Sequence, residues 1–217
     1  IPDKRPAIIR HQNIEALLVD WLARHGKFVR SDENYYYLYH DDHKLYDLET
    51  ERWQAFLHTL TGVNPAMSGF GLIVSGAKTA ANNHAETVPV VKFSHYDRDT
   101  RTLRVSRFDG VVYVLDGQTI TTETNGDGPV LFYDFPSWQP YDLGSGGDYL
   151  NELAQIPHWK NEPDLYSWVF QVWTQSLFFT ELCPTRPIIV ILGEKGSGKS
   201  MALRLLSAAF RRCERFV

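Results

Sequence analysis

The stretch that decides the fold is PIIVILGEKGSGKSMALRLLSAAF, residues 187–210. Its middle part, residues 193–200, fits the pattern G-x-x-x-x-G-K-[ST] at every fixed position. Glycines let the backbone turn tightly, so that several N–H groups converge on the phosphates of a nucleotide. We therefore predict a phosphate-binding loop in this segment.

The residues on either side of the loop supply the context that the motif requires. Residues 188–192 form a continuous aliphatic run, which is typical of a strand buried on both faces of a parallel sheet. Residues 201–210 are strongly apolar and favour a helix. A strand, a glycine loop and a helix in this order indicate a nucleotide site, and a glycine turn in another fold is the less favoured reading.

Each fixed residue of the loop has a predicted role. Lys199 is the predicted catalytic residue, because its ammonium group would reach the β- and γ-phosphates of ATP. The hydroxyl of Ser200 would be a Mg²⁺ ligand, and the positive end of the helix would stabilise the anion further. The predicted nucleotide-binding residues are Gly193, Glu194, Lys195, Gly196, Ser197, Gly198, Lys199, Ser200 and Met201. The predicted cofactors are ATP and Mg²⁺.

At "GEKGSGKS" after an aliphatic run, the sequence resembles the P-loop NTPases, and most of all their AAA+ and helicase branch. This resemblance covers about the last thirty residues. It implies an acidic residue on a later strand, a polar sensor residue and an arginine finger from a neighbouring subunit. No sequence remains in which these parts could occur, and the chain begins with Ile1 rather than Met. We therefore expect a longer parent protein, and we expect hydrolysis only in that parent.

Composition narrows the class of protein. Hydrophobic residues make up 43% of the 217 residues and charged residues 22%, as in ordinary soluble globular proteins. No apolar run approaches the ~20 residues that span a bilayer, and two cysteines give no disulfide framework. We therefore expect a cytoplasmic protein without a membrane partner. The net charge of −4 argues against a basic nucleic-acid coat but leaves a local basic channel possible.

The chain is predicted to have three parts. Residues 1–140 are predicted to form an α+β accessory domain of helices and an antiparallel meander. Residues 141–186 are a linker and a helical connector, and residues 187–217 are the first βα unit of an α/β P-loop NTPase domain. Helices are predicted after the N-cap Asn13 up to Gly26, from Thr50 to Gly62, and from Asn64 to about residue 83.

Alternating patterns predict the strands. An aromatic β-hairpin is expected over residues 35–48, with an acidic turn at residues 41–42. Runs at 88–95, 103–107, 111–115, 118–122 and 130–135 are separated by turn signals and predict the meander. The connector helix is predicted to have one apolar side, made of Leu165, Trp168, Val169, Val172, Trp173 and Leu177. Trp168 and Trp173 are expected to pack against the ATPase domain.

The order of these parts resembles that of replication-associated ATPases of phages and integrating mobile elements. The residues that carry this likeness include "RHGKFVRSDENYYYLY", "LYDLETERWQAFL" and "TLRVSRFDGVVYVLDG". The resemblance implies a homo-oligomeric ring, a DNA helicase or translocase, with the N-terminal domain used for docking or substrate choice. The alternative is a regulatory or defence-type P-loop ATPase, in which nucleotide binding switches assembly. A third possibility is that the N-terminal domain acts as a separate interaction module.

Several other clusters have simpler structural explanations. The run HDDH at residues 40–43 could suggest a metal site, but a solvated acidic turn is favoured, because neighbouring side chains point in different directions. The tyrosines at residues 35–39 could stack on bases beside Lys27 and Arg30. A structural role is favoured for them, because strand tyrosines usually bury one face. The arginines at 204–215 suit a helix C-terminus without any partner.

Overall fold

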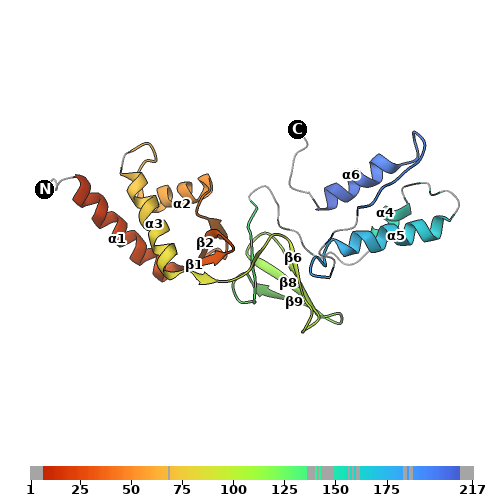
Figure 1. The fold of residues 1–217 in the computed structure, drawn as a ribbon, viewed down its shortest axis with the longest axis horizontal. Helices are drawn as coiled ribbons and strands as arrows, with labels where there is room; N and C mark the ends of the chain where they lie inside the picture. Colours follow the sequence, from red (N-terminus) through yellow and green to blue (C-terminus); the bar gives the residue numbers. More distant parts are fainter. Residues whose placement is uncertain are drawn as a thin grey trace. The chain divides into compact units, whose positions relative to one another are not determined.

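The structure is a computed structural model that describes residues 7–67, 69–135, 140, 142, 149–155, 157, 159, 162–182, 185 and 188–210. Its contacts divide the chain into two compact units (Figure 1). Unit 1 contains Ile1–Lys92 and Thr124–Asp134, and unit 2 contains Phe93–Glu123 and Phe135–Val217. Each unit is therefore built from two separate segments of the chain. The predicted boundary at residue 140 falls inside unit 2.

Unit 1 combines three helices with a small sheet. The helices are α1 (Ala7–His25), α2 (Glu51–Thr61) and α3 (Phe70–His84). The sheet has the order β3-β2-β1-β4 and contains β1 (Gly26–Ser31), β2 (Asn34–Tyr39), β3 (Leu45–Asp47) and β4 (Glu86–Thr87). β1 pairs antiparallel with β2 and parallel with β4, and β2 pairs antiparallel with β3, so the predicted hairpin is confirmed.

The core of unit 1 forms where the helices meet the sheet. Trp53 and Leu57 of α2, Leu22 of α1 and Ile73 of α3 are fully buried together with Tyr37 of β2. The Tyr37 hydroxyl group donates a hydrogen bond to the Leu22 carbonyl oxygen at 2.9 Å, so this buried polar group has a partner. These contacts join residues far apart in the sequence, and their burial supplies the main stabilising term for the unit.

The ends of the helices follow the predictions only in part. α2 begins and ends as expected: the Thr50 side chain accepts a hydrogen bond from the Trp53 N–H, and Gly62 has a φ of 66° at the C-cap. α1 begins at Ala7, so the prediction of an N-cap at Asn13 was wrong. α3 begins at Phe70 rather than near Asn64, because the Asn64 side chain accepts from the Ala66 N–H and closes a separate turn.

The second segment of unit 1 returns to the first through a short parallel pair. β10 (Leu131–Phe132) pairs parallel with β5 (Val90–Val91). The runs 88–95 and 130–135 therefore do not both belong to an antiparallel meander, as had been predicted. The run 88–95 is divided between β5 in unit 1 and β6 in unit 2. Parallel partners can be distant in the sequence, and for that reason no turn signal marks them.

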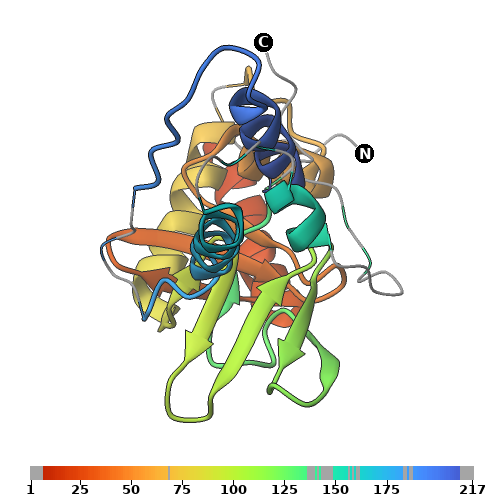
Figure 2. The ribbon, with the colours of Figure 1, turned by 90° about the vertical axis from the view of Figure 1, so that its right-hand side faces the viewer.

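Unit 2 contains the meander. Its sheet has the order β6-β7-β8-β9, with β6 (Ser94–Asp97), β7 (Thr102–Ser106), β8 (Val111–Leu115) and β9 (Ile120–Thr124). β7 pairs antiparallel with β6 and with β8, and Figure 2 shows these strands side by side in yellow-green and green. The predicted meander is therefore present, in four strands rather than five.

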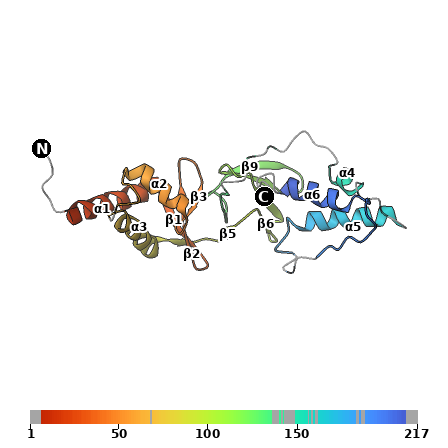
Figure 3. The ribbon, with the colours of Figure 1, turned by 90° about the horizontal axis from the view of Figure 1, so that it is seen from above.

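Three helices complete the described part of unit 2: α4 (Tyr149–Gln155), α5 (Pro163–Ser176) and α6 (Lys199–Phe210). They lie together in Figures 1 and 3. α5 buries Ser167, Phe170 and Thr174. Four residues of the predicted apolar side are exposed: Leu165, Trp168, Val169 and Val172. The packing expected of Trp168 was therefore wrong, whereas Trp173 packs against Phe170. α5 packs through its other side, where Phe170 meets Ala154 of α4.

The chain after α5 covers the edge of the meander. The Ser94 hydroxyl donates to the Phe178 carbonyl oxygen at 3.0 Å, and the Tyr96 N–H donates to the Glu181 carboxylate at 3.1 Å. The Tyr96 ring also meets the Phe179 ring, with a centroid distance of 5.1 Å. The connector is therefore attached to β6, a strand edge that would otherwise have unpaired backbone groups.

Candidate functional site

The aliphatic run before the glycine loop, residues 188–192, has no regular secondary structure. Ile189 and Ile191 pack against Phe170, whereas Ile188, Val190 and Leu192 are exposed, by 89%, 70% and 86%. This alternation has the period of a strand. The described residues 188–192 nevertheless form no strand, and they belong to none of the described sheets. The predicted strand is therefore corrected to an irregular segment with one covered side.

The glycine loop turns directly into a helix. Gly196 and Gly198 have φ values of 88° and 81°, a region that favours glycine over other residues. α6 begins at Lys199, and the Ala202 N–H donates to the Gly198 carbonyl oxygen at 2.9 Å in its first turn. The unsatisfied N–H groups of this helix end are therefore next to the loop, as an anion site requires.

The side chain of Lys199 folds back over the loop. Its ammonium group donates to the carbonyl oxygens of Gly193 and Glu194 at 2.8 and 2.6 Å and to the Ser197 hydroxyl oxygen at 3.0 Å. An ammonium group has three donors, so the loop itself satisfies all of them. The loop is thus curled around the lysine, and phosphate oxygens would have to replace these acceptors.

Three further residues of the predicted site, Lys195, Ser200 and Met201, are exposed to solvent. Lys195 lies at the exposed tip of the loop, and Ser200 is exposed in the first turn of α6 beside Met201, which is 55% exposed. A Cβ atom added at Gly193 would lie 3.2 Å from the Ser197 hydroxyl oxygen and 3.8 Å from the Lys199 nitrogen. A side chain at Gly193 would therefore enter the space inside the loop.

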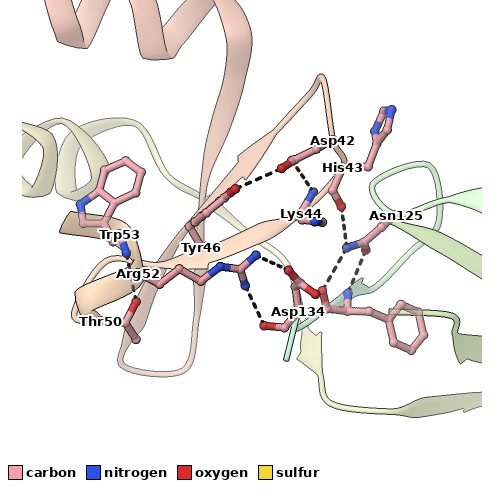
Figure 4. Close-up of polar contacts among 10 residues, drawn as sticks. Asp42, His43, Lys44, Tyr46, Thr50, Arg52, Trp53, Asn125 and Asp134 are labelled. Atoms are coloured by element: carbon pink, nitrogen blue, oxygen red, sulfur yellow. Dashed lines mark hydrogen bonds and ion pairs between the residues drawn. The ribbon is translucent and has the colours of Figure 1, made fainter. Parts of the chain in front are cut away.

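The carboxylates of the acidic turn accept hydrogen bonds from groups of the same hairpin (Figure 4). The Tyr39 hydroxyl donates to Asp41 at 2.5 Å, and the Asp42 carboxylate accepts from the Lys44 N–H and from the Tyr46 hydroxyl, both at 3.0 Å. Burial, together with the negative charge of Asp42, raises the pKa of Tyr46 to about 12. Among the described residues, no group of three or more His, Cys, Asp and Glu side chains could hold a metal ion.

A second polar cluster joins the two segments of unit 1 (Figure 4). The Asn125 amide group donates to the carbonyl oxygens of His43 and Phe132 and accepts from the Phe132 N–H. The Arg52 guanidinium forms an ion pair with the carboxylate of Asp134 and also donates to its carbonyl oxygen at 3.1 Å. Sequence reasoning missed this cluster, because Arg52 and Asp134, like His43 and Asn125, are about eighty residues apart. The predicted run 130–135 marked the segment but not its partners.

The tyrosines of β2 are mainly structural. Tyr36 and Tyr37 are buried, and the Tyr37 ring contacts Phe28, Trp53 and Phe56. A buried ring cannot stack on a nucleic-acid base, so the structural interpretation is confirmed for these two residues. Burial also raises the pKa of Tyr36 above its usual value.

Comparisons with protein-family models, curated proteins and solved structures find no match for this chain. Among the described residues, no helix is both long enough and apolar enough to cross a membrane.

Proposed function

We propose that residues 193–201 bind the phosphates of ATP and that the protein is the N-terminal part of a P-loop ATPase. The observation that carries this proposal is the combination of the loop motif with a helix that begins at Lys199, directly after two glycines with positive φ. In this proposal, residues 187–210 are the first βα unit of an α/β nucleotide-binding domain. The run at residues 188–192 is where further strands would add.

Each residue has a specific role in this proposal. The N–H groups of Gly196 and Gly198 and the N-terminus of α6 hold phosphate oxygens. Lys199 exchanges its three loop acceptors for phosphate oxygens, and Ser200 provides a hydroxyl ligand for Mg²⁺. The bound Mg²⁺ ion neutralises charge on the phosphates. The chain's own contribution is therefore to bind and orient the polyphosphate.

The experiment is a pair of lysine substitutions in one loop. Lys199→Ala should weaken Mg-ATP binding by about a hundredfold, since it removes a charge-assisted contact to phosphate. In this proposal Lys195 contributes only its backbone to the loop, and its side chain lies at the exposed tip, outside the fixed positions of the motif. Lys195→Ala removes the same charge but keeps that backbone, and should leave the affinity within about threefold. Isothermal titration of the full chain with Mg-ATP measures both. Equal affinities of Lys199→Ala and wild type would refute the site.

We further propose that the parent protein works on DNA as a homo-oligomeric ring, as a helicase or translocase. The order of an α+β region, a helical connector and the loop supports this proposal. In unit 1, Lys27, Lys78 and Arg52 are paired with Glu86, Glu49 and Asp134, so these three side chains are less available to DNA phosphates. DNA-stimulated ATP hydrolysis by the parent protein tests the proposal. ATP-dependent assembly without DNA binding at low salt would favour the nucleotide-switched alternative instead.

A further inference from the structure

Asn125 and Gly126 form the only Asn-Gly pair in the sequence. They lie in the turn between β9 and β10, and Asn125 is only 4% exposed. Asn-Gly pairs are chemically labile, because glycine has no side chain to hinder attack by its own backbone nitrogen on the neighbouring amide. Asn125 is therefore a chemically labile residue whose side chain is buried.

The native contacts occupy the Asn125 side-chain amide group. Its nitrogen donates to the His43 carbonyl oxygen at 3.1 Å and to the Phe132 carbonyl oxygen at 3.0 Å. Its oxygen accepts from the Phe132 N–H at 2.9 Å. Both N–H groups and the oxygen are thus engaged. Figure 4 shows these hydrogen bonds of Asn125, and rotation of its side chain would break them.

We propose that Asn125 is a deamidation site that is protected by the fold and becomes reactive only when unit 1 opens. The Gly126 nitrogen attacks the Asn125 side-chain carbonyl carbon, a C–N bond forms, and the side-chain nitrogen leaves as ammonia. Water then opens the resulting succinimide at either carbonyl group. The products are aspartate or isoaspartate at position 125, and no oxidant or reductant is needed.

The product cannot restore the native contacts. A carboxylate has no N–H groups, so it would place negative charge against the carbonyl oxygens of His43 and Phe132 in a buried site. Isoaspartate would also lengthen the backbone. The segment that carries β10 and Asp134, the partner of Arg52, would then fail to dock. Deamidation would therefore convert a transient opening of unit 1 into a permanent one.

The first test compares the full chain in native buffer and in urea at the same mildly alkaline pH. Peptide mapping by mass spectrometry, with an enzymatic isoaspartate assay, measures conversion at Asn125. We expect the native rate to be lower by roughly a hundredfold or more, because reaction must wait for opening. Equal rates in the two conditions would overturn the proposal.

Two variants link the rate to the opening of the segment. Arg52→Met removes the ion pair with Asp134 but no contact of Asn125, and should raise the native rate by about tenfold or more. Lys78→Gln removes an exposed pair elsewhere in unit 1 and should leave the rate unchanged. Equal rates in Arg52→Met and Lys78→Gln would contradict the coupling.

A third variant tests the consequence of the reaction. Asn125→Asp carries the product of deamidation from synthesis and should lose the native protection of backbone amides in β5 and β10, as measured by hydrogen exchange. Wild-type protection in Asn125→Asp would overturn the inference that deamidation disables unit 1. The rate measurement above does not depend on whether this variant folds.

Discussion

Gly26 lies where the backbone of α1 passes into β1, against the opposite strand. A Cβ atom added there would be 2.3 Å from the Leu38 carbonyl oxygen and 2.5 Å from the Tyr37 ring. The neighbouring group is backbone, so it cannot move aside cheaply. Position 26 therefore requires glycine because Leu38 and Tyr37 leave no room for a side chain, and not only because it follows a helix.

Gly26→Ala should lower the free energy of unfolding by about 1–3 kcal/mol, as overpacking typically does. Gly71→Ala is the matched control, because Gly71 lies in α3 with nothing within 4 Å of the added atom. The control should be neutral or stabilising by about 0.5–1 kcal/mol. Urea denaturation measures both variants, and a larger loss for Gly71→Ala would contradict the steric argument.

Because the pKa of Tyr46 is raised, unit 1 should lose stability as the pH rises above 10. The folded pKa is about 12 against a usual value of 10.0, so between these values the folded state binds more protons than the unfolded state. This contribution to stability is complete below pH 10 and is lost as pH rises toward 12. Tyr46→Phe should flatten this part of the profile, as measured by thermal unfolding at successive pH values. An unchanged slope would show that Tyr46 is not responsible.

At the scale of elements, the sequence predicts a helix end correctly where residues at that end cap the helix. The Thr50 cap and the Gly62 terminator of α2 act on backbone groups within a few residues. β1 received no strand prediction, because it is identified by pairing with β2 and β4 rather than by its own pattern. The exposed side of α5 shows the same limit, since periodicity finds an apolar side but does not say which neighbour covers it.

Thr50→Ala should cost about 1 kcal/mol of stability through loss of the N-cap hydrogen bond. Thr59→Ala is a suitable control, because Thr59 is exposed in the same helix and its hydroxyl only donates back to the Ala55 carbonyl oxygen. Chemical denaturation compares the two variants. A control as destabilised as Thr50→Ala would remove the capping explanation.

At the scale of the whole molecule, the chain passes between the two units at residues 92–93, 123–124 and 134–135. Neither unit is a continuous stretch of sequence. The Arg52–Asp134 ion pair and the Asn125 hydrogen bonds close unit 1, and the contacts of β6 with Phe178 and Glu181 join the meander to the connector within unit 2. The first strand of the meander, β6, therefore contacts residues that follow it by about eighty positions.

A fragment that ends at residue 140 tests whether β6 depends on these contacts. It keeps all of unit 1 but removes Phe178, Phe179 and Glu181, which cover β6. Amide hydrogen exchange in β6 should become faster by about tenfold or more relative to a fragment that ends at residue 182. Exchange in β1 and β2 should be the same in both fragments. Equal protection of β6 in the two fragments would refute the dependence.

The sequence by itself determined the glycine loop and the start of its helix, the capped ends of α2, the aromatic hairpin and the antiparallel core of the meander. In each case the signal and the structure lie within a few residues of one another. Only the tertiary structure decided which side of α5 is buried, that β5 pairs with β10, and that Asn125 and Asp134 close unit 1. Those features arise from contacts between distant segments, where burial and hydrogen bonding, rather than local propensity, select the partner.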